Sequence, residues 1–312
     1  ESTPVQIAAL LTALRFRGET PEVVAAFALQ LRKRATPFRR PPGIALDTCG
    51  TGGDHSGTFN ISTAAAFVAA AAGVRVAKHG NRSITSQCGS ADVLTELGVR
   101  IDGSVEEMER ALDEAGICFL FAQAYHPSMR HVAPVRRELG FRTVFNLLGP
   151  LSNPAGATHQ VIGVFGRPQV PLVAEVLRRL GSQRALVVHG SDGLDEITTT
   201  GPTYVAELTG KGVREYVISP EDFGLKVSAP ECLKGGNARE NARIVMEVLS
   251  GATGPCSDIV ALNAGAAIYA AEAADSLAEG VTRAREILTS GAAMEKLEAL
   301  KSAVGASAAP AS

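Results

Sequence analysis

A group of residues suited to binding phosphate lies between positions 50 and 83. It begins with Gly50-Thr51-Gly52-Gly53-Asp54, continues with Asn60-Ile61-Ser62-Thr63 and ends with Lys78-His79-Gly80-Asn81-Arg82-Ser83. Glycines lack a Cβ, so backbone N–H groups can approach an anion closely, while hydroxyl, lysine and arginine side chains can bind or neutralise its oxygens. These residues predict a site for a phosphorylated small molecule.

The glycine cluster differs from the two commonest nucleotide-binding loops. A Walker A loop would close with Gly-Lys-Ser or Gly-Lys-Thr, and the Rossmann fingerprint would need a third glycine where His55 stands. An ordinary glycine-rich turn stays open for the five residues taken alone. Their position between a predicted strand and a predicted helix favours a phosphate loop, because ligands bind at this point of open α/β sheets.

Ser62 and the segment 78–83 each allow two interpretations. Ser62 lies near the start of a predicted helix, where a hydroxyl can cap the helix or join the coordination shell of a metal ion. Residues 78–82 could form a solvated basic turn, but they end a predicted strand in the same crevice as the glycine cluster, which favours binding. Asn81 carries a donor and an acceptor, so it can orient a polar substrate.

A second polar cluster, Asp192-Gly193-Leu194-Asp195-Glu196, follows another predicted strand. Adjacent carboxylates near a phosphate suit Mg²⁺, which proteins hold through one or two carboxylates together with phosphate oxygens. A plain acidic turn is the alternative, and the spacing of an EF-hand is absent. The threonines up to Thr203 only weakly resemble the phosphoribosyl-diphosphate loop of type I phosphoribosyltransferases, because residues 190–193 separate the acids from their strand.

The elements that would position these residues alternate between strands and helices. Continuous apolar runs predict strands at 44–47, 74–77, 117–121, 160–164 and 185–188, and a late hairpin at 203–208 and 213–218. Helical spacing predicts helices at 62–72, 90–97, 105–114, 171–180, 238–249, 258–273 and 277–288. Such strands suit a central, largely parallel sheet that helices flank on both faces, which predicts the α/β class.

Two further regions predict a separate helical part. Residues 4–16 and 21–35 have apolar residues at helical spacing and a proline in the first turn, and a proline-rich linker follows them. Residues 126–154 interrupt the alternation, again with helical spacing. We expect a small all-helical domain of residues 1–40 and 126–154, and a larger α/β domain of residues 43–125 and 155–312.

The composition predicts a globular cytoplasmic protein. The chain has 312 residues, and 30 Lys and Arg against 32 Asp and Glu provide no broad basic surface for nucleic acid. Five cysteines without a Cys-x-x-Cys pair predict neither a disulfide framework nor a structural zinc site. The longest apolar run, 61–72, is too short to cross a bilayer, and no signal peptide opens the chain. We therefore expect no nucleic-acid partner and no membrane partner.

Taken together, the motifs resemble those of the anthranilate phosphoribosyltransferases of tryptophan biosynthesis. The resemblance covers nearly the whole chain, and its motifs, in family order, lie at residues 50–54, 60–63, 78–82, 89–94, 125–127, 133–136, 145–154 and 192–196. It implies a homodimer of two-lobed subunits whose substrates meet between the lobes. Members usually carry further helical residues before the segment that begins here at Ser2, so we expect a shortened small lobe.

The resemblance also implies binding roles for individual residues. Phosphoribosyl diphosphate would bind Gly50, Gly53, Asp54, Thr58, Asn60, Ile61, Ser62, Thr63, Lys78, His79, Gly80, Asn81, Arg82, Ser83, Ile84, Thr85, Ser86 and Ser90. Mg²⁺, with two ions expected, would bind Ser62, Asp195 and Glu196. Catalytic roles would fall to Lys78, His79 and Arg136.

Anthranilate, in the same resemblance, would bind Gly50, Asn81 and Arg136. The planar guanidinium of Arg136 would face the carboxylate of the substrate, a geometry that arginine suits. A surface helix arginine is the alternative interpretation, and it is the one we prefer for Arg137 beside it.

The implied reaction is Mg²⁺-dependent transfer of 5-phosphoribose from phosphoribosyl diphosphate to the anthranilate amine, with release of diphosphate. Lys78 and the loop N–H groups would stabilise the charge on the leaving group, and water or His79 would accept the amine proton. A pyrimidine nucleoside phosphorylase is one alternative, although its second motif has glycine where Asn81 stands. A non-catalytic nucleic-acid-binding relative is another, which the net charge of −2 disfavours.

Overall fold

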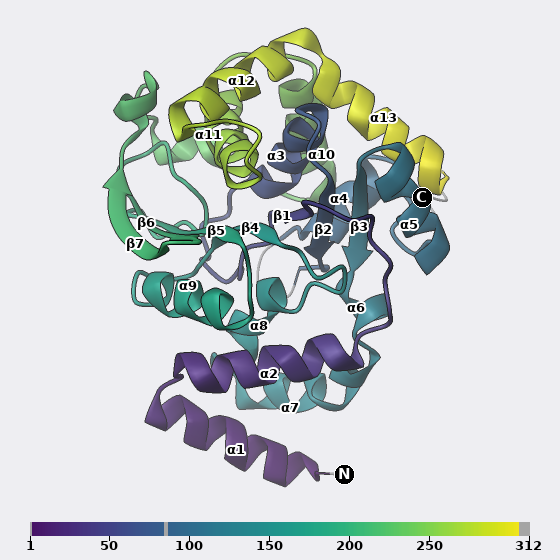
Figure 1. The fold of residues 1–312 in the computed structure, drawn as a ribbon, viewed down its shortest axis with the longest axis vertical. Helices are drawn as coiled ribbons and strands as arrows, with labels where there is room; N and C mark the ends of the chain where they lie inside the picture. Colours follow the sequence, from purple (N-terminus) through teal and green to yellow (C-terminus); the bar gives the residue numbers. More distant parts are fainter. Residues whose placement is uncertain (1, 84–86, 306–312) are drawn as a thin grey trace.

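The structure is a computed structural model that describes residues 2–83 and 87–305, and its centre is a sheet with helices on both faces (Figure 1). The strands are β1 (Leu46–Asp47), β2 (Val76–Gly80), β3 (Ile117–Phe121), β4 (His159–Gly163), β5 (Arg184–Gly190), β6 (Thr203–Thr209) and β7 (Gly212–Ile218). The helices are α1 (Pro4–Arg17), α2 (Pro21–Arg34), α3 (Ile61–Ala71), α4 (Ser90–Glu96), α5 (Val105–Glu114), α6 (Ala122–Tyr125), α7 (Ala133–Leu139), α8 (Phe145–Leu151), α9 (Gln169–Arg179), α10 (Ala238–Leu249), α11 (Pro255–Ala270), α12 (Leu277–Ser290) and α13 (Ala292–Val304). Short 3₁₀ turns lie at η1 (Pro127–His131), η2 (Pro220–Phe223) and η3 (Pro230–Leu233).

Seven strands of the described chain form one sheet in the order β3-β2-β1-β4-β5-β6-β7. The first five in this order are parallel, and β6 and β7 add an antiparallel hairpin at one edge. Leu46 of β1 pairs with Val76 on one side and with His159 on the other. The chain builds outward from β1 through β2 and β3, then returns to the opposite side of β1 to form β4. The order therefore reverses between β1 and β4, where open α/β sheets bind ligands beyond the carboxyl ends of their strands.

Helices cover both faces of the sheet and bury separate sets of apolar side chains. On one face α3, α10, α11, α12 and α13 gather, and α11 packs against both α3 and α12 (Figure 1). Alanines dominate α3, and their small side chains allow neighbouring helices to approach its axis closely. On the other face α9 packs against β5 and β6.

The N-terminal helices lie beyond α8 and α9, away from the sheet (Figure 1). Here α1 packs against α7, while α2 packs against α8 and α9. Thr3 and Thr20 cap the two helices, and a proline follows each cap, which explains where the helices begin. The predicted fold class, a small helical part beside a larger α/β part with a mostly parallel sheet, is confirmed. The residue boundaries of the two domains stay a prediction.

Helix α1 exposes much of its apolar surface. Leu11 is its buried residue, whereas Val5, Leu10 and Phe16 are 78%, 52% and 87% exposed. Leu29 of α2 is also exposed.

The sequence places most elements within three residues of their observed bounds, and the shift of strand β2 is informative. The prediction of 74–77 ends too early, because it treats Lys78, His79 and Gly80 as a polar segment after the strand. In the structure these residues belong to β2 and are buried. Helix α13 is absent from the prediction. Within the described residues, every helix falls short of the length or hydrophobicity that a bilayer crossing requires.

Candidate functional site

The glycine loop, residues 50–54, lies where the strand order reverses. It follows β1 and is attached to the end of β4, because the N–H of Thr51 donates to the carbonyl of Gly163 at 2.8 Å. The N–H of Phe165 in turn donates to Oγ1 of Thr51 at 3.1 Å. Gly52 and Gly53 have φ angles of +64° and +78°, in the left-handed region that glycine enters at little cost. The loop thus occupies the crevice in which the topology predicts a ligand.

The acidic pair, Asp195 and Glu196, lies directly against this loop. Oδ2 of Asp195 accepts a hydrogen bond from the N–H of Gly52 at 2.7 Å, and Oε1 of Glu196 accepts one from the N–H of Ser62 at 3.1 Å. A Cβ on Gly50 would lie 2.8 Å from the Asp195 carboxylate, so only glycine leaves enough space there. The structure therefore brings together segments that are 143 and 134 residues apart in sequence.

Polar side chains hold the turn that carries the acidic pair. Oδ2 of Asp192 accepts hydrogen bonds from the hydroxyls of Thr198 at 2.8 Å and Thr200 at 2.6 Å. Asn263 of α11 holds the backbone of Ile197 on both sides, accepting from its N–H at 2.9 Å and donating to its carbonyl at 2.8 Å. The threonines that weakly resemble a type I phosphoribosyl-diphosphate loop thus stabilise this turn.

Negative charge is concentrated beside the glycine loop. Burial raises the pKa of Asp195 well above its ordinary value, and the nearby charges of Asp54 and Glu196 raise it further. Burial also raises the pKa of Glu196 to about 7, although the Lys78 ammonium acts in the opposite direction. Both acidic residues retain partial exposure to solvent. Carboxylates this close repel one another unless a proton or a cation joins them.

The side chains at this point fit a magnesium ion. Two carboxylates and the hydroxyl of Ser62 supply oxygen ligands, which Mg²⁺ prefers. Thr48, Gly50, Ser62 and Glu196 contribute to the lining of a cavity of about 10 Å³, which is close to the space that one water molecule needs. In the described parts of the chain, no three His, Cys, Asp or Glu side chains group as a metal site of their own. An ion here would complete its shell with water or substrate oxygens.

Ser62 does not cap helix α3. The helix begins after Asn60, whose side chain makes no capping hydrogen bond, and Ser62 is its second residue. The hydroxyl of Ser62 instead lies 3.4 Å from Nζ of Lys78. The hydroxyl of the next residue, Thr63, is buried and has no hydrogen-bond partner among the residues described. Of the two interpretations of Ser62, helix capping is therefore wrong.

Lys78 is a buried cation that is fully bonded within the protein. Its Nζ donates to the carbonyl and the hydroxyl of Thr48, at 2.9 and 3.2 Å, and to the hydroxyl of Ser62. These three acceptors match the three protons of an ammonium group. The charge of Lys78 lowers the pKa of both Asp47 and Glu196, against the effect of burial. Its direct contact with a phosphate stays a prediction.

His79 is buried and neutral. Its Nδ1 lies 3.0 Å from the carbonyl of Gly149, and because a carbonyl only accepts, we assign the proton to Nδ1. Burial lowers the pKa of His79 to about 3, and the neighbouring His126 makes a smaller contribution in the same direction. The His126 ring packs edge-on at 5.2 Å between centroids. The lone pair on Nε2 is buried and meets no hydrogen-bond donor in the described chain.

Asp47, at the end of β1, is a central residue of the site that the sequence did not reveal. Its two carboxylate oxygens accept from the N–H of His79 at 3.1 Å and from Nδ2 of Asn153 at 2.8 Å. The same Nδ2 donates to the carbonyl of Ala77. Burial raises the pKa of Asp47 to about 6. The residue thereby joins β1, β2 and the segment after α8, through contacts that no local sequence pattern could indicate.

The residues after Lys78 and His79 turn toward helix α4. Arg82 forms an ion pair with Asp92 at 2.9 Å, and the N–H of Ser83 donates to the same carboxylate at 3.0 Å. The hydroxyl of Ser90 donates to the carbonyl of Asn81 at 3.3 Å, so close to Gly80 that a Cβ there would lie 2.3 Å from it. Three further predicted donor-site residues, Ile84, Thr85 and Ser86, lie outside the described residues.

Thr58 and Asn60 connect the donor segment to helix α10 and to the chain just before it. Thr58 forms an isolated antiparallel bridge with Lys234. The side chain of Asn60 accepts from Nδ2 of Asn241 at 3.0 Å and donates to the carbonyl of Cys88 at 3.3 Å. Asn60 is therefore fixed by protein groups. Ile61 is a buried residue of the core.

Arg136 lies on helix α7, in the helical part of the structure, and its side chain contacts Phe145 of α8. Its guanidinium lies 5.4 Å from the centre of the Phe145 ring, and burial lowers its pKa. Within the described chain no acidic side chain pairs with it, whereas Arg137 is exposed. Arg142, six residues later, donates to the carbonyl of Gly53 in the glycine loop. Sequence reasoning missed Arg142, because nothing nearby marks it as a contact of a loop 89 residues away.

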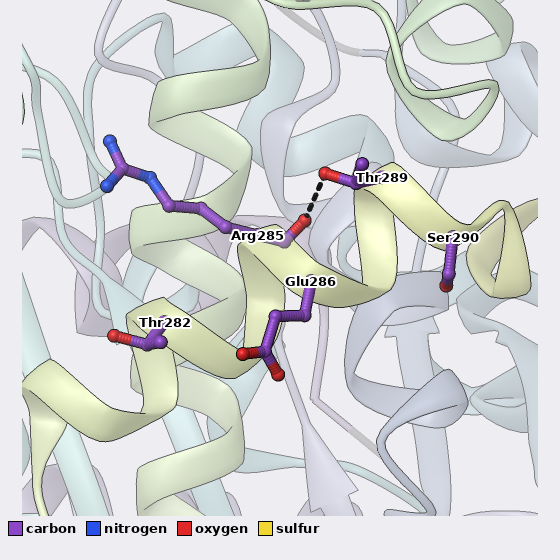
Figure 2. Close-up of a pocket in the computed structure, with 5 residues that line it drawn as sticks. All are labelled: Thr282, Arg285, Glu286, Thr289 and Ser290. Carbon is purple, nitrogen blue, oxygen red and sulfur yellow. Dashed lines mark hydrogen bonds between the residues drawn. The ribbon is translucent and has the colours of Figure 1, made fainter.

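A separate hollow on helix α12 is not part of this site. Its volume is about 480 Å³, and Thr282, Arg285, Glu286, Thr289 and Ser290 line it. Figure 2 shows these side chains on one helix, with Arg285 and Glu286 pointing in different directions; the hydrogen bond drawn joins the hydroxyl of Thr289 to the carbonyl of Arg285. Because its polar groups do not converge, we assign no function to it.

Comparison with known proteins gives the family relations of the chain. Residues 42–294 match the glycosyl transferase family a/b domain, and residues 1–35 match the glycosyl transferase family helical bundle domain. The chain is 59% identical to an anthranilate phosphoribosyltransferase of Rubrobacter xylanophilus over 298 residues, which cover 95% of this chain and 87% of the relative.

Two solved structures are similar over most of their length. The crystal structure of anthranilate phosphoribosyltransferase from Thermus thermophilus has a TM-score of 0.93 and 51% identity, covering 97% of this chain and 91% of that one. The enzyme from Saccharomyces cerevisiae, in complex with PRPP and Mg, has a TM-score of 0.89 and 30% identity, covering 96% and 85%.

The environment of His79 predicts its behaviour on titration. We expect nitrogen NMR to detect a neutral ring with the proton on Nδ1, and no protonation as the pH falls from 8 to 5. Because the pKa of the folded state is depressed, the contribution of His79 to stability is present above about pH 6.5 and is lost as the pH falls toward 3. Free histidine in the same buffer provides the comparison spectrum. Protonation of His79 near its ordinary pKa would contradict the prediction.

Proposed function

The chain belongs to the anthranilate phosphoribosyltransferase family, and we propose that it transfers 5-phosphoribose from phosphoribosyl diphosphate to the amine of anthranilate. One observation carries the proposal most directly: the acidic pair, Asp195 and Glu196, hydrogen-bonds to the backbone of Gly52 and Ser62. A loop suited to phosphate and carboxylates suited to Mg²⁺ thus lie at one point of the crevice. Neither a nucleoside phosphorylase nor a nucleic-acid-binding relative would need that acidic pair.

The donor would lie on the glycine loop and the start of α3. Backbone N–H groups of a glycine loop favour an anion. In the structure those of Gly52 and Ser62 donate to Asp195 and Glu196, so the donor would bind the other N–H groups of the loop. Ser62, Asp195 and Glu196 would hold Mg²⁺, which when bound supplies positive charge to the diphosphate leaving group. The Lys78 ammonium adds charge from behind this pocket, through Thr48 and Ser62. Its buried position leaves its geometry fixed before the substrate binds.

The acceptor would enter from the side of helix α7. Arg136 has a half-buried guanidinium with no acidic partner among the described residues, so it is available for the anthranilate carboxylate. Asn81 and Gly50 would complete the acceptor contacts. With both substrates held, the amine nitrogen forms its bond to C1′ of the ribose while the C1′–oxygen bond to diphosphate breaks, and diphosphate leaves with the electron pair. Correct placement of two partners can account for much of the acceleration.

The amine loses a proton after the new bond forms. His79 is one candidate acceptor, but the burial that keeps its ring neutral also makes it a weak base. We therefore propose that Nε2 of His79 accepts a hydrogen bond and helps to orient a substrate, and that the proton departs to water.

The activity can be measured directly, because anthranilate is fluorescent and its fluorescence falls as it is consumed. We expect loss of fluorescence when the protein is mixed with anthranilate, phosphoribosyl diphosphate and Mg²⁺. The double variant Asp195→Asn, Glu196→Gln should lose most of kcat, by roughly a hundredfold or more, together with the dependence on Mg²⁺. Calorimetric titration with Mg²⁺ and diphosphate should count two ions per chain. A double variant with near-normal, Mg²⁺-stimulated turnover would refute the metal site.

Substitution of Arg136 should affect mainly the acceptor. We expect Arg136→Ala to raise the KM for anthranilate by about tenfold or more, because a charge-assisted pair with the carboxylate is lost, and to change the KM for phosphoribosyl diphosphate much less. Arg137→Ala removes the same charge from the exposed neighbouring position and is the matched control. An unchanged anthranilate KM in steady-state kinetics would exclude the assignment of Arg136.

We also propose a cytoplasmic homodimer. The five cysteines are free thiols, which suits a reducing compartment, and cell fractionation tests the location. On α1 the side chains of Val5 and Phe16 are 78% and 87% exposed, and we propose that they contact a second copy of the chain.

Substitution of Phe16 tests the dimer. We expect sedimentation to give twice the chain mass for the original protein and a single chain mass for Phe16→Glu, since a buried carboxylate would oppose the contact. Val227→Glu, at an exposed apolar residue outside the N-terminal helices, is the control. A monomeric original protein, or a dimer that survives the change at Phe16, would contradict this interface.

A further inference from the structure

Arg142 lies in the short loop between α7 and α8, and both sides of this loop are fixed. Gly140 ends α7 in a left-handed conformation, with φ of +66°. The N–H of Thr143 donates to Oδ1 of Asn146 at 2.9 Å, and the N–H of Asn146 donates back to the carbonyl of Thr143 at 2.9 Å. The side chain of Arg142 therefore starts from a well-defined backbone.

The guanidinium of Arg142 contacts two segments of the α/β part. Its Nη2 donates to the carbonyl of Gly53, and its Cζ lies 4.4 Å from the centre of the Phe165 ring. A planar guanidinium can stack on a ring and still donate from its edge, which the ammonium of lysine cannot do in the same way. The ring thus holds the plane of the guanidinium in the direction that the hydrogen bond needs.

The glycine loop is attached at three consecutive residues. Thr51 is bonded to the end of β4, Gly52 to Asp195 and Gly53 to Arg142. Of these three attachments, the third comes from the chain segment that also carries Arg136. The donor loop and the proposed acceptor arginine are therefore linked through six residues of one loop and helix.

The hydrogen bond from Arg142 also determines where a neighbouring donor points. In a planar trans peptide the carbonyl and the following N–H point in opposite directions. When Arg142 holds the carbonyl of Gly53, the N–H of Asp54 points away from Arg142. Glycine at φ of +78° has no strong preference of its own, so an external contact is needed to fix this peptide.

We propose that Arg142 is a positioning residue of the donor site, which fixes the Gly53–Asp54 peptide for diphosphate binding and links it to the helical segment that carries Arg136. The inference rests on the proposed function. The inference gives Arg142 a role in binding phosphoribosyl diphosphate, although Arg142 lies in the segment that carries Arg136, the arginine proposed to bind anthranilate. Arg142 acts through the loop backbone, and no contact of its own with the substrate is required.

The test compares Arg142→Ala and Arg142→Lys with Arg137→Ala, which removes an exposed arginine from the same region. We expect Arg142→Ala to raise the KM for phosphoribosyl diphosphate on the order of tenfold and the KM for anthranilate less than about threefold. Arg142→Lys should recover only part of the loss, because it restores the charge but not the planar group on Phe165. Arg137→Ala should leave both constants unchanged.

Calorimetry with inorganic diphosphate and Mg²⁺ provides a readout that does not depend on turnover. We expect Arg142→Ala to weaken this binding by about tenfold, with a thermal midpoint that confirms a folded protein. Phe165→Leu removes the ring under the guanidinium but keeps Arg142 and its hydrogen bond to Gly53, so it should give a smaller loss of affinity. This variant replaces Arg142→Ala in the test if Arg142→Ala does not fold. Equal diphosphate affinity in the original protein and the Arg142 variants would overturn the proposal.

Two further outcomes separate this inference from neighbouring ones. A lower thermal midpoint with unchanged kinetic constants would mean that Arg142 only stabilises the fold, and a rise confined to the anthranilate KM would make it an acceptor residue; either result overturns the proposal. If the original protein does not consume anthranilate, the proposed function fails, and the calorimetric comparison still decides the role of Arg142.

Discussion

The arrangement of the site depends on one buried positive charge, the ammonium of Lys78. It donates to Thr48 and Ser62, and its field lowers the pKa of Asp47 on one side and of Glu196 on the other. A buried charge without a partner costs several kcal/mol, so the loss of this cation would leave two carboxylates unbalanced. The same group therefore stabilises the join between β1 and β2 and sets the electrostatic state of the acidic pair. Stability and function cannot be separated at this position.

The binding crevice also depends on the close approach of the acidic turn to the backbone at Gly50 and Gly163. A Cβ on Gly163 would lie 1.4 Å from the carbonyl oxygen of Asp195, and one on Gly50 would lie 2.8 Å from its carboxylate. The acidic turn can reach the glycine loop only because both positions lack a side chain. The crevice lies where the strand order reverses between β1 and β4. Asn263 of α11 supports the acidic turn through its hydrogen bond with the backbone of Ile197. The helices α3 and α11, on one face of the sheet, thus contribute residues to the lining of the site as well as support for its acidic turn.

Sequence patterns predicted the features that depend on local order, and missed those that depend on distant contacts. The strands followed from continuous apolar runs, and the proximity of Asp195 and Glu196 to Ser62 followed from the family resemblance. Strand β2 was placed too early, because Lys78 and His79 are polar by type and become strand residues only when Thr48 and Gly149 satisfy them. Asp47 pairs with Asn153 across 106 residues. No sequence pattern predicts a hydrogen bond between residues this far apart in the chain.

The complete burial of the Lys78 amine has a practical consequence for handling the protein. Acylating reagents attack amines that solvent can reach. Lys78 is only 3% exposed, and its ammonium group has a hydrogen-bond acceptor for each of its three protons. Exposed lysines such as Lys33, Lys211 and Lys226 would react first. Coupling to a dye or a solid support through lysine would therefore modify surface lysines and leave the ammonium group of Lys78 unmodified.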